Sequence, residues 1–558
     1  MADLKASTTA RSGRGWNPLS LALFGGLWIS TLGNWPLWLA LARLPEMASL
    51  RGAIFIVGFG LMVAALATGL LTLAAWRLSV KPAIAVLVVS AAIGAYFMGT
   101  YGIVLDPTMM MNVLQTDPRE VGDLLSLQFV GNFLVLAVLP LAWLWQARVR
   151  SLTWPAQTLR NALAVLGCTA LLAALIIGLF ADLSATMRNH RSLRYMINPV
   201  NAFFSLGVLA KQANARPVGP LQPIGAGARL ADRAAGSRPP LLVLVVGETA
   251  RADHFSLNGY ARPTNPELAQ ENVVSFRDVT SCGTNTAASL PCMFSALDRN
   301  AYEVRDRDQE NLLDLTQRVG LAVLWLDNQS GCKDLCDRVP HAAAIDAVPG
   351  AAAPPAPLCS ESECYDDALL YNLDARLAAL PAERRNHGVL IVLHQMGSHG
   401  PAYFKRSPPD RKPFGPECET PALQQCPLDA VINAYDNSIA YTDHMLAETI
   451  RWLGRHAATY DPTLLYLSDH GESLGENNLY LHGLPYAFAP REQTHVAMVA
   501  WLGPATTQAG NPQFECLRRR RDMPLTHDSM FHTVLGVLGI DAVEYKNALD
   551  AFAACRGR

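Results

Sequence analysis

Acidic and histidine side chains follow four apolar segments in the C-terminal half of the sequence. They are Glu248 after PLLVLVVG, Asp327 after LAVLWL, His394 and His399 after GVLIVL, and Asp469, His470 and His482 after TLLYLS. Carboxylates and imidazoles together suit zinc or manganese better than magnesium, which prefers oxygen ligands throughout. A single histidine is more often a structural residue than a ligand. The repeated placement of such residues after successive segments nevertheless favours a metal site.

The stretch SCGTNTAASLPC, residues 281–292, supplies candidate nucleophiles between two cysteines. A free hydroxyl is a weak nucleophile, and coordination to a metal activates it. The pattern TNTAASL predicts a loop that enters a helix near Thr286, where the helix N-terminus favours an anionic group. A role for Thr286 as a helix cap fits the same pattern, and Thr284 and Ser289 are competing hydroxyls. A disulfide between the two cysteines would hold this loop.

The elements that must position these residues are predicted to be strands and helices in alternation. The four apolar segments are continuous runs of valine and leucine, as in buried parallel strands. Helical patterns lie between them, for example over Asp367–Leu380 and Ala434–Leu453. This order predicts an α/β fold with a mostly parallel sheet. Ligands in such folds bind beyond the carboxyl ends of the strands, where the polar residues are expected.

The N-terminal part of the 558-residue chain is predicted to cross a membrane. A spanning helix needs about 20 predominantly apolar residues. Five segments meet this length, namely Leu19–Ala42, Gly52–Trp76, Ala83–Leu105, Gln128–Gln146 and Ala162–Ala181. Asn34 and Pro36 predict a kink in the first of them.

Charge and cysteine placement both predict an extracytoplasmic C-terminal part. Lys and Arg are richer in the loops on one side, including Arg148, Arg150 and Arg160, which predicts that this side is cytoplasmic. Five spans then place the remainder outside. Eight cysteines form close pairs, Cys282/Cys292, Cys332/Cys336, Cys359/Cys364 and Cys418/Cys426. Disulfides persist in an oxidising compartment. The sequence leaves open whether Cys516 and Cys555 also pair.

Three regions are therefore expected along the chain. Residues 1–182 form a five-span transmembrane domain, and residues 241–558 form the α/β domain. Residues 183–240 join them as an interfacial helix and a linker, because basic and apolar residues mix before a run rich in Pro, Gly and Ala. The net charge of −2 gives no indication of nucleic acid binding, and no such partner is predicted.

Five motifs resemble the motif set of the phosphoethanolamine transferases, inner-membrane members of the alkaline phosphatase and sulfatase superfamily. They are VVGETAR at 245–251, SCGTNTAASLPCMFS at 281–295, DNQSGCKDLCDRV at 327–339, HQMGSHGPAY at 394–403 and LSDHGESLGE at 467–476. The lipid A-modifying branch, which includes the colistin-resistance transferases, is most similar. The resemblance covers nearly the whole chain. It implies a multi-pass protein of the bacterial inner membrane whose periplasmic domain, residues 241–558, has an alkaline phosphatase-like fold and depends on zinc.

The resemblance also implies roles for individual residues. The family's zinc ligands fall on Glu248, Thr286, Asp469 and His470, and its nucleophile falls on Thr286. Its further phosphate and second-metal positions match Ser330, Lys333, His394, His399 and His482. One zinc ion or two are therefore expected, with His394 or His482 as either a general acid or a ligand of the second ion. Asp327 matches no ligand position, so a structural role is expected for it.

A further substrate-binding set is implied within NVLQTDPRE. The family carries an Asn, a Thr and a Glu at four-residue intervals in a periplasmic loop, which match Asn112, Thr116 and Glu120. Residues at this spacing share one helix face. Pro118 interrupts such a helix, so the position of Glu120 relative to the other two stays open. Glu120 is a candidate partner for the ethanolamine ammonium.

The implied reaction has two steps. Thr286 attacks the phosphorus of phosphatidylethanolamine, diacylglycerol leaves, and phosphoethanolamine stays on the threonine. A phosphate of lipid A then takes the group. A monomer that works at the membrane on these two lipids is expected.

Several alternatives stay open on the sequence. Related enzymes serve Kdo, heptose or glucan acceptors, and a phosphoglycerol transferase is a close rival, although its relatives lack the dense cysteine pairs. A sulfatase needs a convertible cysteine or serine followed by Pro and Arg, and Met293 stands in place of that Arg. A binding module with a degenerate site would lack a ligand, whereas all four matching ligand positions are filled.

Overall fold

The protein is described by a computed structural model, which divides into two compact units. The model describes residues 15–116, 121–122, 124–215, 219–234, 236–348, 352–360, 363–508 and 510–556. One unit comprises Met1–Asp106 and Leu125–Gly207, and the other comprises Pro107–Leu124 and Val208–Arg558. In the described residues, the first unit is helical and the second holds the principal sheet.

The first unit contains long apolar helices. Its helices are α1 (Pro18–Ser30), α2 (Trp35–Ala42), α3 (Leu50–Thr72), α4 (Val80–Tyr101), α7 (Leu127–Phe133), α8 (Leu139–Gln146), α9 (Trp154–Gly178) and α10 (Phe180–Asn189), and α11 (Val200–Ala215) begins in it. A π-helical turn over Leu134–Val138 joins α7 to α8. Four stretches in the described part of the chain are long and apolar enough to cross a membrane, namely α3, α4, α7–α8 and α9.

The first predicted span is not one continuous helix, so four such helices are found where five spans are predicted. A short 3-10 turn over Leu32–Asn34 separates α1 from α2. Pro36 supplies no backbone N–H, and the Asn34 amide donates to the carbonyls of Ile29 at 2.8 Å and Asn198 at 2.6 Å. The Asn34 side-chain oxygen in turn accepts from the Asn198 N–H at 2.9 Å. These contacts replace the helical hydrogen bonds that the break removes.

Helix packing leaves an apolar outer surface on this unit. Helix α3 packs against both α1 and α9. Only 6% of the most apolar 18-residue stretch of α9 is buried. Leu163, Leu166 and Ile177 are exposed along this helix. Apolar side chains at these positions are stable in hydrocarbon and costly in water.

The second unit is built on a seven-stranded sheet of order β3-β13-β10-β2-β9-β5-β6. The strands are β2 (Pro240–Gly247), β3 (Val274–Phe276), β5 (Ala322–Asp327), β6 (His341–Ala343), β9 (Val389–His394), β10 (Asp461–Ser468) and β13 (Met498–Trp501). Strands β10, β2, β9, β5 and β6 pair in parallel, while β13 pairs antiparallel with both of its neighbours, β10 and β3. The four predicted apolar segments are therefore four neighbouring strands of a mostly parallel sheet.

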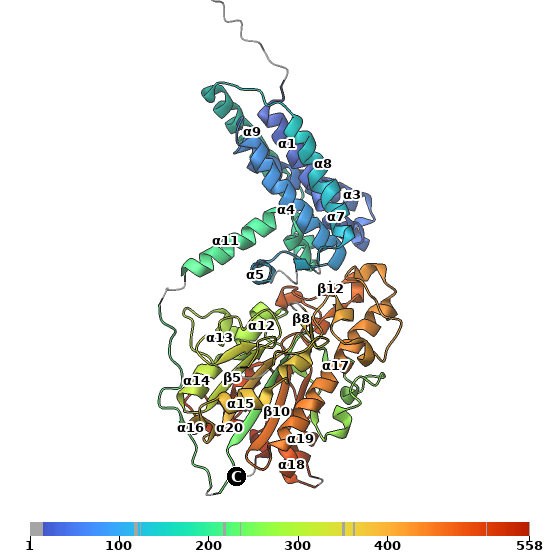
Figure 1. The fold of residues 1–558 in the computed structure, drawn as a ribbon. Helices are drawn as coiled ribbons and strands as arrows, with labels where there is room; N and C mark the ends of the chain where they lie inside the picture. Colours follow the sequence, from blue (N-terminus) through green and yellow to red (C-terminus); the bar gives the residue numbers. More distant parts are fainter. Residues whose placement is uncertain are drawn as a thin grey trace, which may run out of the picture. The chain divides into compact units, whose positions relative to one another are not determined.

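Helices cover both faces of this sheet, as Figure 1 shows. Alternate residues of β2 supply two hydrophobic cores, because successive side chains point to opposite faces. Leu242, Leu244 and Val246 pack into one core with residues of α12, α14 and α20. Leu241, Val243 and Val245 pack into the other core with residues of α15 and α17. The strand is buried on both sides, which explains its continuous apolar sequence.

The helices of the second unit vary widely in length. They are α5 (Pro107–Gln115), α12 (Thr286–Met293), α13 (Arg299–Glu303), α14 (Leu312–Arg318), α15 (Leu373–Ala379), α16 (Ala382–Arg385), α17 (Leu428–Arg455), α18 (Gly503–Thr506), α19 (Pro512–Arg519) and α20 (Asp528–Leu538). Short strand pairs complete the unit: β1 (Arg229–Leu230) with β15 (Ile540–Asp541), β4 (Val279–Thr280) with β14 (Leu525–Thr526), β7 (Cys359–Ser360) with β8 (Glu363–Cys364), and β11 (Ser473–Leu474) with β12 (Tyr480–Leu481).

Disulfides join all four predicted cysteine pairs. The bonds are Cys282–Cys292, Cys332–Cys336, Cys359–Cys364 and Cys418–Cys426. The structure adds the bond that the sequence leaves open, Cys516–Cys555, which ties α19 to the C-terminal segment. Cys168, in the first unit, is the free cysteine among the described residues.

Strand register brings the candidate residues to one edge of the sheet. Gly247 of β2 is opposite Ser468 of β10, so Glu248 and Asp469 follow at the same level. His394 at the end of β9 is opposite Asp327 at the end of β5. The residues that follow the apolar segments thus gather at the carboxyl ends of adjacent strands.

Candidate active site

Four side chains from three segments converge in the interior of the second unit. The Thr286 hydroxyl lies 3.1 Å from Glu248 Oε2 and 3.4 Å from His470 Nε2. His470 Nε2 lies 3.3 Å from Glu248 Oε1 and 3.4 Å from Asp469 Oδ2. Glu248, Asp469 and His470 are completely buried, and Thr286 is 5% exposed. We call these four residues the threonine cluster.

The Thr286 hydroxyl is held at the first turn of α12. Asn285 is the N-cap of this helix, because its side chain accepts a hydrogen bond from the Ala288 N–H at 2.9 Å. Thr286 is therefore not the cap. The competing hydroxyl of Thr284 is engaged elsewhere, since it donates to the Leu484 carbonyl at 2.7 Å. The helix N-terminus adds positive potential on the side of the hydroxyl.

Glu248 and Asp469 are each oriented by one of their carboxylate oxygens. Glu248 Oε2 accepts from Gln329 Nε2 at 2.8 Å as well as from Thr286. Asp469 Oδ1 accepts from the backbone N–H groups of Thr249 at 3.2 Å and His470 at 2.7 Å. Thr249 adopts a left-handed conformation with φ of 53°. The second oxygen of each carboxylate is thereby left pointing at the cluster.

The His470 ring is fixed in the orientation that a metal ligand requires. Its Nδ1 lies 2.9 Å from the Gly471 carbonyl, which can only accept, so Nδ1 carries the proton. When a cation takes the place of the second ring proton, Nε2 would present a lone pair on the side of Thr286, Glu248 and Asp469. Metal-binding histidines commonly donate their other ring N–H to a carbonyl in this way.

The donor set of the threonine cluster fits a zinc ion. Glu248 Oε1 and Asp469 Oδ2 are buried and have no hydrogen-bond partner among the described residues. Burial and the negative charge of Glu248 raise the pKa of Asp469 to about 7. Burial opposes ionisation of His470, but Asp469 and Glu248 outweigh it and raise the pKa of His470 to about 10. Each shift favours added positive charge, which a bound cation supplies. Two carboxylates, an imidazole and a hydroxyl are acceptable zinc ligands.

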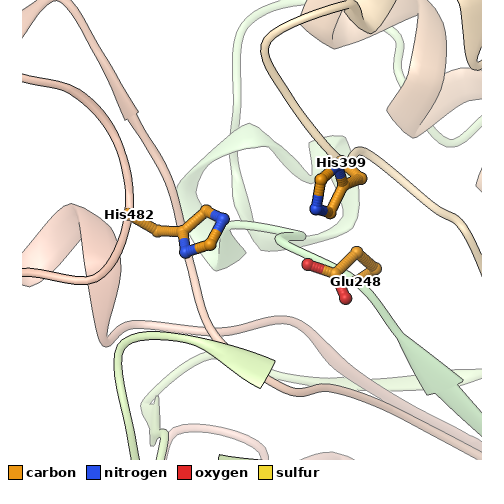
Figure 2. Close-up of side chains that lie close together, drawn as sticks. All are labelled: Glu248, His399 and His482. Carbon is orange, nitrogen blue, oxygen red and sulfur yellow. The ribbon is translucent and has the colours of Figure 1, made fainter. Parts of the chain in front are cut away.

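A second potential metal group shares Glu248 with the first. Ligand atoms of Glu248, His399 and His482 lie within 4.8 Å of one another. Figure 2 shows the three side chains, from three separate segments, directed toward a common space. Burial and the charges of His470 and His399 hold the pKa of His482 well below its ordinary value, so His482 is neutral and able to bind a cation. We call Glu248, His399 and His482 the second group.

His394 is joined to Asp327, which gives Asp327 a specific contact. His394 Nδ1 lies 2.9 Å from Asp327 Oδ2, and His394 Nε2 is buried without a hydrogen-bond partner among the described residues. Burial disfavours the charged ring, but Asp327 outweighs burial and raises the pKa of His394 above its ordinary value. Asp327 Oδ1 accepts from the N–H groups of Gln329 and Gly331. The carboxylate thus orients both the ring and the loop after β5.

Ser330 and Lys333 line a hollow next to this loop. Lys333 Nζ donates to the Ser330 hydroxyl at 3.0 Å and to the Ser330 carbonyl at 3.2 Å. The hollow has a volume of about 600 Å³, and Asp327 and Gln329 also line it. Gln329 joins the hollow to the threonine cluster through its bond to Glu248. The structure gives no direct contact between Lys333 and the cluster.

Of the predicted substrate-binding residues Asn112, Thr116 and Glu120, the structure describes the first two. Asn112 lies on α5, which ends at Gln115, and Thr116 follows the helix with its hydroxyl donating to the Asn112 carbonyl at 2.8 Å. Glu120 lies outside the described residues, so its relation to the other two stays a prediction. Helix α5 packs against α12, and the Gln115 carbonyl accepts from Lys333 Nζ at 3.4 Å.

Two side chains in the site were missed by sequence reasoning. Gln329 orients Glu248, yet an isolated glutamine after a strand gives no signal of that contact. Arg251 belongs to the VVGETAR motif, and its side chain is only 5% exposed. It donates to Glu476 Oε1 at 2.5 Å and to the Glu472 carbonyl at 3.1 Å, which ties the loop after β2 to the loop after β10. The sequence did offer one indication of this role, namely a charged residue at the end of a motif that also contains the candidate ligand Glu248.

Family models and curated relatives match most of the chain. A family model described as Phosphoethanolamine transferase EptA/EptB matches residues 63–213, and one described as Sulfatase matches residues 240–540. The chain is 38% identical over 516 residues to Phosphoethanolamine transferase EptA of Salmonella typhimurium, covering 91% of each chain. It is 39% identical over 503 residues to Phosphatidylethanolamine transferase Mcr-1 of Escherichia coli, covering 88% of this chain and 89% of the relative.

A solved structure extends the similarity to both units. The integral membrane protein lipooligosaccharide phosphoethanolamine transferase A (EptA) from Neisseria meningitidis matches with a TM-score of 0.89 and 34% sequence identity, covering 96% of this chain and 98% of that chain. The apolar helices and the sheet unit therefore correspond to a membrane domain and a periplasmic sulfatase-like domain. The chain belongs to the EptA/EptB family of phosphoethanolamine transferases, as an inner-membrane enzyme whose C-terminal domain is periplasmic and has an alkaline phosphatase-like fold.

Proposed function

We propose that the protein transfers phosphoethanolamine from phosphatidylethanolamine to a phosphate of lipid A and releases diacylglycerol, with Thr286 carrying the group between the two lipids. One observation carries this proposal. The Thr286 hydroxyl lies 3.1 Å from Glu248 and 3.4 Å from His470, in a buried cluster that favours a cation. A hydroxyl in such a place is suited to attack phosphorus.

Zinc is the proposed cofactor. Glu248, Thr286, Asp469 and His470 would hold one ion, and the second group would hold another. Zinc supplies Lewis-acid chemistry here, because it lowers the pKa of a coordinated hydroxyl and offsets charge on phosphoryl oxygens. Residues 1–182 act as the membrane anchor, residues 241–558 act as the catalytic domain, and the protein works as a monomer.

In the first step, Thr286 Oγ1 forms a bond to the phosphorus of the donor, and the bond from phosphorus to the glycerol oxygen breaks. The hydroxyl proton of Thr286 leaves along its hydrogen bond to Glu248 Oε2, and it returns to Thr286 Oγ1 when the threonine is released in the second step. The N-terminus of α12 stabilises the anionic phosphoryl group. Lys333 contributes a positive charge from the neighbouring hollow, and positioning together with electrostatics supplies most of such catalysis.

The glycerol oxygen needs a proton as it leaves. His394 is the proposed donor of this proton, because Asp327 stabilises its charged form and its Nε2 has no other described partner. His482 is the other candidate for this role, but burial and the charges of His470 and His399 hold its pKa well below its ordinary value, so its proposed role is that of a ligand in the second group. The two roles separate by pH dependence, since only a general acid must be protonated to act.

In the second step, an oxygen of the acceptor phosphate attacks the same phosphorus, and the bond to Thr286 Oγ1 breaks. The acceptor phosphate is already ionised, so this step needs no strong base. The neisserial relative is named a lipooligosaccharide phosphoethanolamine transferase, which supports an acceptor of the lipid A class. Asn112, Thr116, Glu120, Ser330, Lys333 and His399 are the proposed substrate-binding residues.

Asp327→Asn tests the role of the His394 pair. Asn cannot stabilise the imidazolium, so the pKa of His394 should fall. A general acid then loses its proton at lower pH, and the alkaline limb of the kcat profile should shift downward. We expect kcat above neutral pH to fall by about 10- to 100-fold. The measurement is transfer from phosphatidylethanolamine as a function of pH.

Asp337→Asn is the matched control, because Asp337 is exposed on the same loop. Its pH profile should coincide with that of the unmodified enzyme. An alkaline limb that stays in place in Asp327→Asn would mean that His394 is not the general acid.

The proposed donor and acceptor are tested together in cells. Mass spectrometry of lipid A, with and without the chain, should show an added phosphoethanolamine that depends on Thr286. An increment on Kdo, on heptose or on a glucan instead would move the acceptor to that group. A phosphoglycerol increment would replace the donor.

A further inference from the structure

A pair of buried polar side chains, His527 and Ser289, lies behind the threonine cluster. His527 comes directly before α20, and Ser289 is on α12, three residues after Thr286. Both are buried, with His527 1% exposed and Ser289 completely enclosed. Their facing atoms, His527 Nδ1 and Ser289 Oγ, are 3.3 Å apart. We call this pair the His527–Ser289 bridge.

The imidazole of His527 connects two separate backbone segments. Its Nε2 lies 3.0 Å from the Ser468 carbonyl, which can only accept, so Nε2 carries the proton. Its Nδ1 then accepts from the Cys282 N–H at 3.0 Å. Burial lowers the pKa of His527 to about 3, so the neutral ring keeps this donor–acceptor order near neutral pH. The ring therefore links the end of β10 to the start of the nucleophile loop.

Ser289 makes a parallel connection. Its hydroxyl donates to the Asp469 carbonyl and lies 3.3 Å from the Gly283 N–H, which donates to it. Asp469 and His470 follow β10 directly, while Gly283 lies three residues before Thr286. The side chains of His527 and Ser289 thus connect the segment that bears the proposed ligands Asp469 and His470 to the loop that precedes Thr286.

The spacing between these segments decides whether Thr286 can act. The Thr286 hydroxyl is 3.4 Å from His470 Nε2, and a ligand must lie within about 2.0–2.2 Å of zinc. A shift of the loop of about 1 Å would remove the hydroxyl from the coordination sphere, and a displacement of that size costs on the order of 100-fold in rate. Removal of the His527 ring would leave the Cys282 N–H without its hydrogen-bond partner.

We propose that His527 is a positioning residue, which with Ser289 sets the distance between the Thr286 loop and the ligands Asp469 and His470. It touches neither substrate nor metal and acts through Thr286. The inference rests on the proposed function only where that function makes Thr286 a zinc ligand. It predicts that loss of the imidazole weakens zinc binding because the Thr286 ligand is lost.

If His527 only stabilised the fold, its removal would affect zinc binding no more than the removal of another buried histidine. His532 provides this comparison. His532 lies on α20, the helix that His527 precedes, is 2% exposed, and accepts from the Lys546 N–H at 3.2 Å through its Nδ1. Its removal likewise costs a hydrogen bond from a backbone N–H, but in the described residues it makes no contact with His527 or Ser289. His532→Ala is therefore the matched control.

The test is a double-mutant cycle on zinc affinity, measured with the full-length metal-free protein against a competing chelator. We expect His527→Ala and Thr286→Ala each to weaken zinc binding by about 10- to 100-fold. The double variant should bind zinc as weakly as Thr286→Ala alone, because both changes remove the same ligand. His532→Ala should stay within about twofold of the unmodified protein.

Additive losses in the double variant would overturn the proposal, since His527 would then act independently of Thr286. Unchanged affinity in His527→Ala would overturn it as well. If Thr286→Ala itself leaves zinc affinity unchanged, the ligand role in the proposed function fails instead. If His527→Ala does not fold, Ser289→Ala replaces it in the double-mutant cycle. The double variant Ser289→Ala/Thr286→Ala should then also bind zinc as weakly as Thr286→Ala alone.

Discussion

Thr286→Ala should abolish transfer, with kcat reduced on the order of 10⁴-fold or more. Alanine removes the oxygen that forms the bond to phosphorus, and the two competing hydroxyls of this stretch are engaged elsewhere. Thr284 is directed to the Leu484 carbonyl and Ser289 to the Asp469 carbonyl. The readout is steady-state transfer together with mass spectrometry of peptides from enzyme quenched during turnover. The phosphoethanolamine adduct should appear on Thr286 in the unmodified enzyme and on no peptide of the variant.

Two further variants make this result specific. Thr286→Ser keeps a hydroxyl at the head of α12 and should retain measurable transfer. Thr284→Ala removes a neighbouring buried hydroxyl and should still give the adduct on Thr286. Full turnover by Thr286→Ala, or an adduct that moves to another residue, would contradict the covalent route.

Glu248→Gln should have the largest effect on metal content. Gln has nearly the same size but no charge, and Glu248 belongs to both the threonine cluster and the second group. We expect zinc affinity to fall by more than about 100-fold, with loss of transfer. Elemental analysis of the purified full-length protein, together with chelator competition, measures the effect.

His399→Gln is the informative comparison for Glu248→Gln, because His399 lies only in the second group. It should remove no more than one ion and leave the threonine cluster loaded. Undiminished zinc content in Glu248→Gln would exclude both groups as metal sites. Equal loss in the two variants would mean that the groups do not bind independently.

Four strands of the sheet could be predicted from sequence because burial on both faces requires a continuous apolar run. Strands β2, β5, β9 and β10 are buried on both faces, so each reads as an unbroken apolar run with a polar residue at its end. Parallel pairing then places all four ends at one edge. This reasoning gathers Glu248, His394 and Asp469 before any distance is known.

Other features depend on contacts that no local pattern encodes. The break after α1 is fixed by Asn198, which is 164 residues away from Asn34 in sequence. A structural role is expected for Asp327 from the sequence, but its partner, His394 on the neighbouring strand, cannot be read from any local pattern. His527 lies 245 residues from the Cys282 N–H that it accepts. A lone histidine before a helix looks the same in sequence whether it faces solvent or a ligand-bearing loop.

Because Glu248 belongs to both potential metal groups, its single negative charge limits how many cations the site can hold. Asp469 and Glu248 are the ionisable acids of the two groups, so together they balance the charge of one divalent cation. A second cation leaves two positive charges uncompensated in a buried region, which is strongly unfavourable. Anionic phosphoryl oxygens would supply that compensation. Occupancy by the second ion and by the donor lipid must then be reciprocal, because each raises the affinity for the other by the same factor.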